Sequence, residues 1–463
     1  MAFLGLELPA WTRPALDPGF VPLSALFARY AQGAAQPLAV AVEREDGQVS
    51  VYETAVFGTP DCARADRYYV ERLVKLLLWI RGGFRVSVCG DAALGRAVAE
   101  AYAPGGARDF DRGFMERIYE RPFEVRVLPY EARPAPAEGT RAVSGGVDGC
   151  RVGLDVGASG RKVCAMRDGL VVYSGQAPWQ PKTNPDPNYH YEALVASLRD
   201  AAAHLPRVDG VGISTAGVLV GQKCMVASLF LALSQADFDR CAKDMFTRAA
   251  ASLGQNIPCV VANDGDVAAL AGAVALEERA LLGISMGTSE AGGYVGRDGG
   301  LTGWLNELAF CPVDAQPQGW HDEWSGDVGC GVKYLSQDAA ILLAGRAGLP
   351  LPEGNPSERF RAVRAAMEAG DPRAAAVYRD LGVYLGHAAA LYARFYDLDR
   401  ILVMGGVTGG PGGDLILEQA RAVLAHDYPA LSFVLSFPDE KVRALGQSVA
   451  AASLPELNLG ASK

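Results

Sequence analysis

Residues 150–175 read CRVGLDVGASGRKVCAMRDGLVVYSG. Apolar runs alternate there with short turns that contain glycine, a pattern that predicts three strands in quick succession. The first turn runs from Asp155 to Lys162, and its glycines allow successive backbone N–H groups to approach a ligand and hold phosphate oxygens. A plain hairpin with glycines at positive φ accounts for the same letters, so this turn alone identifies no ligand.

The chain beyond this stretch alternates helices with strands and predicts an α/β fold. Helices are expected over 190–205, 238–254 and 266–276, and strands over 208–215 and 257–265. A second strand, turn and strand follow over residues 280–296, after which the order of elements begins again. This indicates two halves that share a topology without sharing a sequence.

Two more glycine turns lie in the second half. The first, Ser285–Gly293, has the same setting between strands as the turn at Asp155. The second follows a strand within ILVMGGVTGGPGGDLILEQ, residues 401–419, where Gly405 and Gly406 leave bare backbone for a base and ribose. A helix that starts near Asp414 adds its N-terminal dipole. Each turn is ambiguous alone, but the three in this order predict nucleotide binding.

A candidate general base lies between the two phosphate-type turns, where the strand Val260–Asn263 ends in Asp264. An aspartate at a strand end can accept the proton of a hydroxyl that attacks a phosphoryl group. The alternative is a helix N-cap, because a helical pattern follows. Asp266 is better placed to cap, which leaves Asp264 to face a substrate.

Two common nucleotide motifs are excluded. The pattern G-x-x-x-x-G-K-[ST] of the Walker A loop is absent from the chain. The turn at Asp155 is not a dinucleotide fingerprint either, because a strand and not a helix follows it.

The stretch 129–146 is rich in Pro, Ala and Gly and has no apolar period, which is typical of a linker. We therefore predict four parts: an N-terminal α/β domain over 1–130, a linker over 131–148, a first lobe over 149–275 to which a helix over 444–455 returns, and a second lobe over 276–443. The N-terminal domain shows a hairpin around Glu45–Gly47 and a helix over 64–83, but no catalytic motif.

Composition limits the partners. Among 463 residues, 43 Lys and Arg stand against 53 Asp and Glu, a formal net charge of −10. Nucleic acids and anionic membranes require a basic face, so neither is expected as a partner. Nine scattered cysteines without C-x-x-C spacing favour reduced thiols, and no signal peptide or membrane-spanning run is seen. We expect a cytoplasmic protein. A homodimer is compatible with these observations.

Together these segments resemble the ROK family of sugar kinases, within the actin-like ATPase superfamily, over roughly residues 150–452. The resemblance implies two actin-like lobes around a nucleotide cleft and a requirement for ATP and Mg²⁺. It maps the catalytic base to Asp264, a water-mediated Mg²⁺ contact to Asp155, and substrate contacts to Asn263 and Glu307. It implies nucleotide contacts at Asp155, Gly157, Ser159, Gly160, Lys162, Gly287, Thr288, Ser289, Gly405, Gly406 and Val407.

Departures from the family pattern concern the sugar. The E-x-G-H segment aligns with Glu307-Leu-Ala-Phe310, and the G-C-x-E segment with Gly329-Cys-Gly-Val332, so two polar sugar contacts become apolar. A pocket that lacks such partners binds a sugar hydroxyl poorly, which argues against ordinary glucose. Only Cys330 remains of the family's zinc ligands, so no zinc site is expected.

Two segments could supply other acceptor contacts. The polar stretch 177–192 contains Trp179, Lys182, Asn184, His190 and Tyr191, and the stretch 320–327 contains two tryptophans. Of these, Trp179 and His190 are predicted to bind substrate. The first segment is equally well explained as a Pro-rich surface loop, and the alternative for the second is an aromatic surface patch on a loop.

The resulting hypothesis is an ATP-dependent kinase that phosphorylates a hydroxyl of a sugar or sugar-like small molecule. The alternatives are a non-catalytic regulator that binds sugar or nucleotide, and an actin-like ATPase coupled to a partner.

Overall fold

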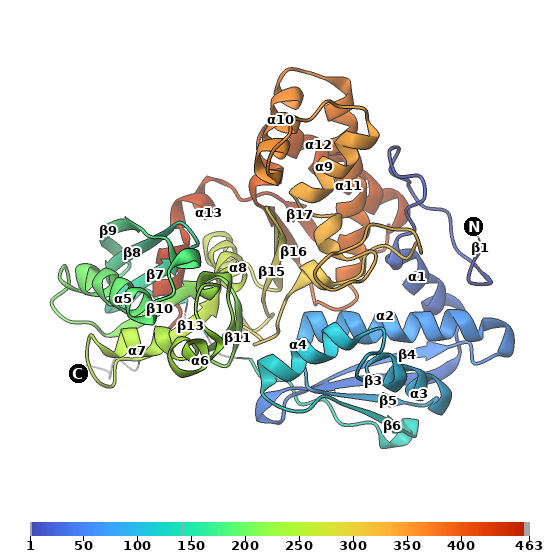
Figure 1. The fold of residues 1–463 in the computed structure, drawn as a ribbon, viewed down its shortest axis with the longest axis horizontal. Helices are drawn as coiled ribbons and strands as arrows, with labels where there is room; N and C mark the ends of the chain where they lie inside the picture. Colours follow the sequence, from blue (N-terminus) through green and yellow to red (C-terminus); the bar gives the residue numbers. More distant parts are fainter. Residues whose placement is uncertain (1, 141–142, 144, 458–463) are drawn as a thin grey trace. The chain divides into compact units, whose positions relative to one another are not determined.

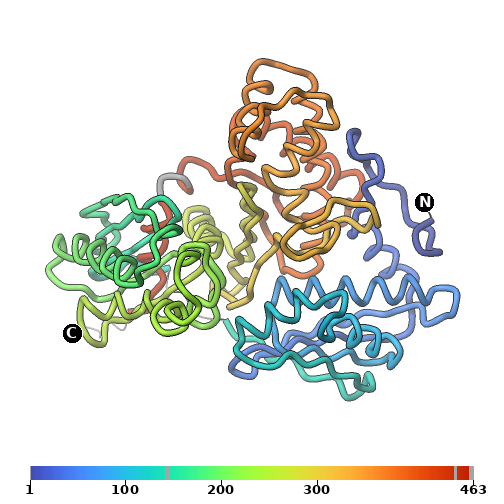
Figure 2. The backbone as a smooth tube through the Cα atoms, in the orientation of Figure 1, coloured from blue at the N-terminus to red at the C-terminus, as the bar shows by residue number. Residues whose placement is uncertain are grey.

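The computed structural model describes residues 2–140, 143 and 145–457 (Figure 1). Residues 141, 142 and 144 of the predicted linker lie outside the described residues. The chain forms two compact units, between which it passes several times (Figure 2). Unit 1 comprises Met1–Gly139, Ile284–Gly292 and Trp304–Phe437, and unit 2 comprises Thr140–Gly283, Gly293–Gly303 and Pro438–Lys463. Unit 1 thus joins the N-terminal region to most of the predicted second lobe.

Unit 2 is built on a five-stranded sheet in the order β13-β10-β7-β8-β9. The strands β7 to β9 form an antiparallel meander, and β10 and β13 add in parallel. The predicted three strands are confirmed. The bounds are β7 Cys150–Val156, β8 Gly160–Arg167, β9 Leu170–Pro178, β10 Gly210–Thr215 and β13 Cys259–Asn263, with a separate hairpin of β11 Val218–Val220 and β12 Lys223–Val226.

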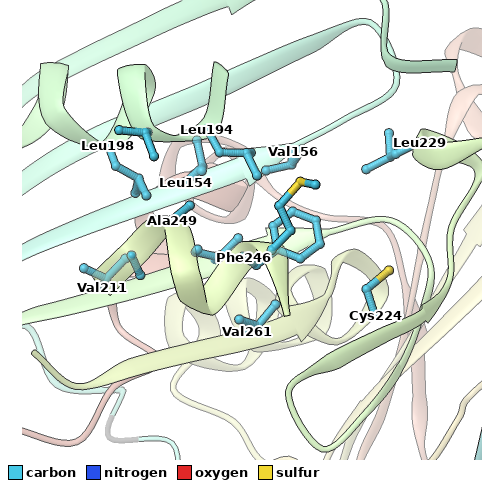
Figure 3. Packing of buried hydrophobic residues seen from close by; sticks show 14 of the residues in the cluster. Leu154, Val156, Leu194, Leu198, Val211, Cys224, Leu229, Phe246, Ala249 and Val261 are labelled. Atoms are coloured by element: carbon cyan, nitrogen blue, oxygen red, sulfur yellow. The ribbon is translucent and has the colours of Figure 1, made fainter. Parts of the chain in front are cut away.

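Helices cover both faces of this sheet. Figure 3 shows Leu154 of β7, Leu194 of α5 and Phe246 of α7 in one apolar layer. The preceding residue of β7, Gly153, points to the other face, where a Cβ would lie 1.9 Å from the carbonyl oxygen of Ser448 in α14. Glycine therefore permits this helix to pack against the sheet. The helices are α5 Pro187–Ala202, α6 Gln235–Asp237, α7 Met245–Ala251, α8 Asp264–Leu276, α13 Glu440–Leu445 and α14 Gln447–Ala452.

Two predicted helices differ in detail. The pattern over 238–254 predicts one helix, but a π-helical turn over Phe238–Ala242 precedes α7. The predicted helix over 444–455 consists of two, because Gly446 has φ +66° and interrupts it between α13 and α14.

Unit 1 contains a four-stranded sheet in the order β4-β3-β5-β6, flanked by helices of the N-terminal region (Figure 1). The hairpin predicted around Glu45–Gly47 is confirmed, since β3 and β4 pair across it. The bounds are β1 Ala2–Phe3, β2 Leu6–Glu7, α1 Leu23–Gly33, β3 Gln36–Glu43, β4 Val49–Val56, α2 Ala63–Arg81, β5 Arg85–Cys89, α3 Ala92–Ala101, α4 Asp109–Tyr119 and β6 Glu124–Leu128.

A second sheet has the order β15-β14-β16-β17, and the division of the chain into units falls within β14 and within β15. In unit 1 the helices α11 and α12 pack tightly against each other. The bounds are β14 Leu281–Met286, β15 Glu290–Val295, α9 Gln337–Arg346, α10 Pro356–Glu368, α11 Pro372–Tyr392, β16 Arg400–Met404, α12 Gly410–Asp427 and β17 Val434–Ser436. Among the described residues, none of the helices is long and apolar enough to span a bilayer.

Candidate functional site

The first phosphate-type turn joins β7 to β8 and is held by hydrogen bonds to the backbone of Gly157. The N–H group of Gly157 donates to the carbonyl of Gly160 at 3.0 Å. The indole Nε1 of Trp179 donates to the carbonyl of Gly157 at 2.8 Å, and the guanidinium of Arg161 lies 5.0 Å from the Trp179 ring. Ser159 and Lys162 are exposed. The turn is therefore held in one shape while its outer side stays open.

The glycines of this turn are not required by the fold. Neither Gly157 nor Gly160 has a positive φ, so the plain hairpin with strained glycines is not what the structure contains. A Cβ at Gly157 would meet nothing closer than a carbonyl oxygen at 3.4 Å, and one at Gly160 nothing closer than 3.5 Å. A Cβ fits at both positions, so neither backbone strain nor packing explains why these residues are glycine.

Two carboxylates lie at the end of the parallel strands in unit 2. Asp155 lies opposite Ser214 in the register of β7 and β10, and the Ser214 hydroxyl donates to Asp155 Oδ1 at 2.9 Å. Burial raises the pKa of Asp155. Burial also raises the pKa of Asp264, and the neighbouring charge of Asp155 raises it further. The strand register thus brings together the two carboxylates that the sequence analysis selected.

The helix cap after β13 differs from the prediction. Asn263, and not Asp266, is the N-cap of α8, because its side-chain oxygen accepts from the N–H of Gly265 at 2.7 Å. Its amide nitrogen donates to the carbonyl of Gly217 at 2.8 Å. Asp266 instead accepts from the N–H of Tyr294 at 3.1 Å. Asn263 therefore fixes the start of α8, where Asp264 lies, and we assign it a positioning role.

Two residues that were predicted to contact substrate, Trp179 and His190, form hydrogen bonds within unit 2. His190 is 0 % exposed, and its ring nitrogens lie 2.9 Å from the carbonyl of Asp186 and 3.0 Å from that of Pro181. The Trp179 ring is buried beneath the first turn. Both side chains are buried and bonded to backbone carbonyls of unit 2, which is a structural role and not the predicted contact with substrate.

The second phosphate-type turn, in unit 1, joins β14 to β15. The N–H of Gly287 donates to the carbonyl of Ser289 at 2.9 Å, and the carbonyl of Gly287 accepts from the N–H of Gln337. Thr288 and Ser289 are exposed. Like the glycines of the first turn, Gly287 has no positive φ, and its nearest Cβ contact would be 3.7 Å away.

In the loop after β16, the fold requires glycine at position 405 but not at position 406. Gly405 has φ +102°, and a Cβ there would lie 2.4 Å from the carbonyl oxygen of Met286. At Gly406 a Cβ would meet nothing within 4 Å. The Val407 side chain is buried, so only its backbone can serve a ligand. The loop leads into the N-terminus of α12.

The segment with Glu307 is attached to the N-terminal region within unit 1. The N–H of Glu307 donates to the carbonyl of Trp79 in α2 at 3.0 Å, and the Phe310 ring stacks on the Trp79 ring with centroids 4.3 Å apart. Val332 is half-buried. Within the described part of the chain, no group of three or more His, Cys, Asp or Glu side chains could hold a metal ion.

Sequence reasoning missed two side chains that adjoin these loops. Ser214 bonds to Asp155, and a polar residue at the end of the neighbouring parallel strand was the available signal. Glu290 follows the second turn and is buried, with the Tyr392 hydroxyl donating to its Oε1 at 2.9 Å. Burial raises the pKa of Glu290 to about 8. Its partner is 102 residues away, so no local pattern indicated it.

Comparison with solved structures defines the class of fold. A ROK-family glucokinase from Streptomyces griseus, in complex with glucose and AMPPNP, is 22% identical; the match covers 66% of this chain and 99% of that chain, with a TM-score of 0.50. A ROK hexokinase from Thermus thermophilus is 21% identical, with coverage of 66% and 97% and a TM-score of 0.51. No protein-family model and no curated protein matches the sequence.

About two thirds of the chain therefore shares the α/β fold of these two ROK-family structures. About a third of it lies outside the part matched by these two structures.

Proposed function

We propose that this protein is an ATP-dependent kinase that transfers the terminal phosphoryl group to a hydroxyl of a sugar or sugar-like small molecule. The observation that carries the proposal is the set of glycines that the fold does not need. They lie on each of the three loops expected to bind nucleotide, and neither φ nor a neighbouring atom requires them: Gly157, Gly160, Gly287 and Gly406. A ligand that approaches the bare backbone explains all of them.

Asp264 is the proposed general base. A general base works best when its pKa lies near the pH at which the enzyme operates, and burial beside Asp155 moves the pKa of Asp264 in that direction. Asn263 fixes the helix end that carries it. Asp264 would orient the acceptor hydroxyl and take its proton, while the N–H groups of the turns would hold phosphate oxygens.

Asp155 fits the proposed Mg²⁺ contact, because carboxylate oxygens are the ligands that Mg²⁺ prefers and one oxygen is oriented by Ser214. When bound, Mg²⁺ would neutralise charge on the phosphates of ATP. The nucleotide would be held by backbone groups of the three loops that contain Gly157, Gly287 and Gly406.

The acceptor is proposed to differ from free glucose. Phe310 and Val332 stand where the resemblance places polar sugar contacts, and Phe310 is occupied by stacking on Trp79. The glycines that the fold does not require would serve a kinase, a regulator and a partner-coupled ATPase alike. They therefore give no reason to prefer either of the two alternatives to a kinase.

The test is ATP turnover with Mg²⁺ against a panel of sugars, amino sugars and polyols, with a blank that lacks acceptor. Asp264→Asn is expected to lower turnover by at least about a thousandfold while nucleotide affinity changes little, because it removes the base and not the phosphate contacts. Asp266→Asn is the matched control, since it lies on the same helical turn. Gly157→Ala is expected to weaken nucleotide binding without loss of thermal stability.

The contrary results are specific. Turnover that needs no acceptor would favour a partner-coupled ATPase. Nucleotide or sugar binding without turnover would favour a regulator, and full activity of Asp264→Asn would exclude the assigned base.

A further inference from the structure

A cluster of buried charges joins the N-terminal helices to residues 320–330 within unit 1. Asp327 Oδ2 lies 2.9 Å from Arg72 Nη1, 2.8 Å from Lys75 Nζ and 2.6 Å from Arg108 Nη1. Arg72 and Lys75 belong to α2, and Arg108 immediately precedes α4. Lys75 is 0 % exposed and Asp327 8 %. One carboxylate thus receives three cations from a region more than 200 residues away in the chain.

Two further carboxylates balance the cluster. Glu71 pairs with Arg72 at 2.7 Å and also with Arg108, and Asp111 lies 3.4 Å from Lys75. Burial alone would raise the pKa of Asp327, but Arg72 and Lys75 hold it below its ordinary value. Asp327 is therefore ionised at neutral pH, and a buried ion of this kind depends on all its partners.

Asp327 lies in a turn that is ordered by its own contacts. The carboxylate of Asp322 accepts from the N–H of Ser325 at 2.9 Å, and the N–H of Asp322 donates to the carbonyl of Asp327 at 2.8 Å. Between these residues Trp324 is 69 % exposed. A large apolar ring in solvent, on a turn that is fixed at its base, is suited to stacking on the ring of a ligand.

The same turn leads into two paired segments that contain the predicted acceptor contacts, joined by an antiparallel bridge between Pro312 and Cys330. The N–H of Gly331 donates to the carbonyl of Cys311, and the N–H of Val313 to the carbonyl of Gly329, both at 2.8 Å. Residues 307–313 and 329–332 are therefore joined side by side. A displacement of the Asp327 turn would be transmitted directly to both.

The C-terminal end of α2 holds the other side of this pair. The carbonyls of Trp79 and Ile80 accept from the N–H groups of Glu307 and Asn306, each at 3.0 Å. The Trp79 ring stacks on Phe310, and its Nε1 donates to Asp111 of the charge cluster at 2.8 Å. One helix thus contacts the segment at Asp327 and again at Glu307 and Phe310.

We propose that the N-terminal region is a working part of the kinase: α2 and Arg108 position the acceptor segment, residues 306–332, through Asp327 and Phe310. This inference rests on the proposed function, because it assigns the acceptor to that segment. Asp327, Arg72, Lys75 and Arg108 are positioning residues. The contacts that hold the segment come from side chains and backbone carbonyls of the chain's own N-terminal region. Phe310 stands where the resemblance places a zinc ligand of the family.

The experiment compares Asp327→Asn and Arg108→Gln with the wild type. Asp109→Asn is the matched control, because Asp109 makes an exposed ion pair with Arg112 on the same helix α4. Hydrogen exchange is followed in peptides covering residues 306–332 and residues 150–160. KM for the acceptor, KM for ATP and kcat are measured with an acceptor that the wild type phosphorylates.

Asp327→Asn is expected to speed exchange over residues 306–332 by about tenfold or more, because the segment loses its anchor. KM for the acceptor should rise by roughly fivefold or more, with KM for ATP and exchange over residues 150–160 unchanged. Arg108→Gln should show a smaller effect of the same kind and serves if Asp327→Asn does not fold. Asp109→Asn should match the wild type.

Faster exchange with an unchanged acceptor KM would overturn the inference, and so would unchanged exchange. A wild type that phosphorylates no acceptor is the failure of the proposed function itself. It would remove the acceptor role of the segment even where exchange shows that Asp327 anchors it.

Discussion

Glu290 shows how a single buried carboxyl gives the molecule a pH dependence. The folded protein holds its proton up to pH about 8, whereas an unfolded Glu releases it near pH 4.3. Between these values the folded state binds more protons than the unfolded state, so stability falls as the pH rises. The stabilisation is fully present below the unfolded pKa and is lost as the pH rises through the folded pKa.

We therefore predict a loss of roughly 2 kcal/mol in the free energy of unfolding between pH 6 and pH 8 from Glu290 alone. Glu290→Gln cannot ionise and should lack this part of the pH dependence. The measurement is urea unfolding of both proteins at several pH values, followed by a probe in unit 1. Parallel stability curves for the two proteins would show that Glu290 is not protonated in the folded state.

At the scale of elements, helix packing predicts that substitution by Ala changes the stability of unit 1 in opposite directions at Gly382 and at Gly345. A Cβ at Gly382 of α11 would lie 2.6 Å from the carbonyl oxygen of Ile416 in α12, whereas at Gly345 of α9 it would meet nothing within 4 Å. Gly382→Ala should destabilise unit 1 by about 1–3 kcal/mol through overpacking. Gly345→Ala should stabilise it by about 0.5–1 kcal/mol, the helix propensity of Ala over Gly.

Both variants are compared by chemical unfolding. Destabilisation by Gly345→Ala, or tolerance of Gly382→Ala, would mean that these helices pack differently.

The elements also show what the sequence could predict. Local patterns were sufficient for the β7–β9 meander and the N-terminal hairpin, because apolar alternation and turn residues act between near neighbours. They placed Asp155 and Asp264 at strand ends, and parallel pairing brings such ends together. They do not identify the cap of α8, since Asn263 and Asp266 both suit a helix start and the tertiary contact of Asp266 with Tyr294 decides between them.

Other contacts had no local signal. His190 and Trp179 appeared as ligand contacts because a polar stretch does not reveal which backbone carbonyls it will meet. The cations around Asp327 lie far away in the chain, so no spacing rule could connect them.

At the scale of the whole molecule, the first residues of the chain form hydrogen bonds with helix α11 of unit 1, and not only with elements of the N-terminal region. The Asp380 carboxylate of α11 accepts from the N–H groups of Ala15 and Leu16, at 2.9 and 2.6 Å, and is buried. The Asp17 carboxylate accepts from the Tyr384 hydroxyl at 2.9 Å. The first residues therefore contribute to the stability of helices more than 350 positions later.

Asp380→Asn should lower the stability of unit 1 by about 1–3 kcal/mol, because the amide NH₂ group then faces a backbone N–H and leaves it without an acceptor. Asp371→Asn is the control: Asp371 caps the same helix near the surface, and Asn caps a helix as well as Asp does. Because the chain forms two compact units, the loss should be confined to one of them. Hydrogen exchange should accelerate in peptides from α11 and the first 20 residues, while β7 and β10 in unit 2 exchange as in the wild type. Equal acceleration in both units would show that they unfold as one.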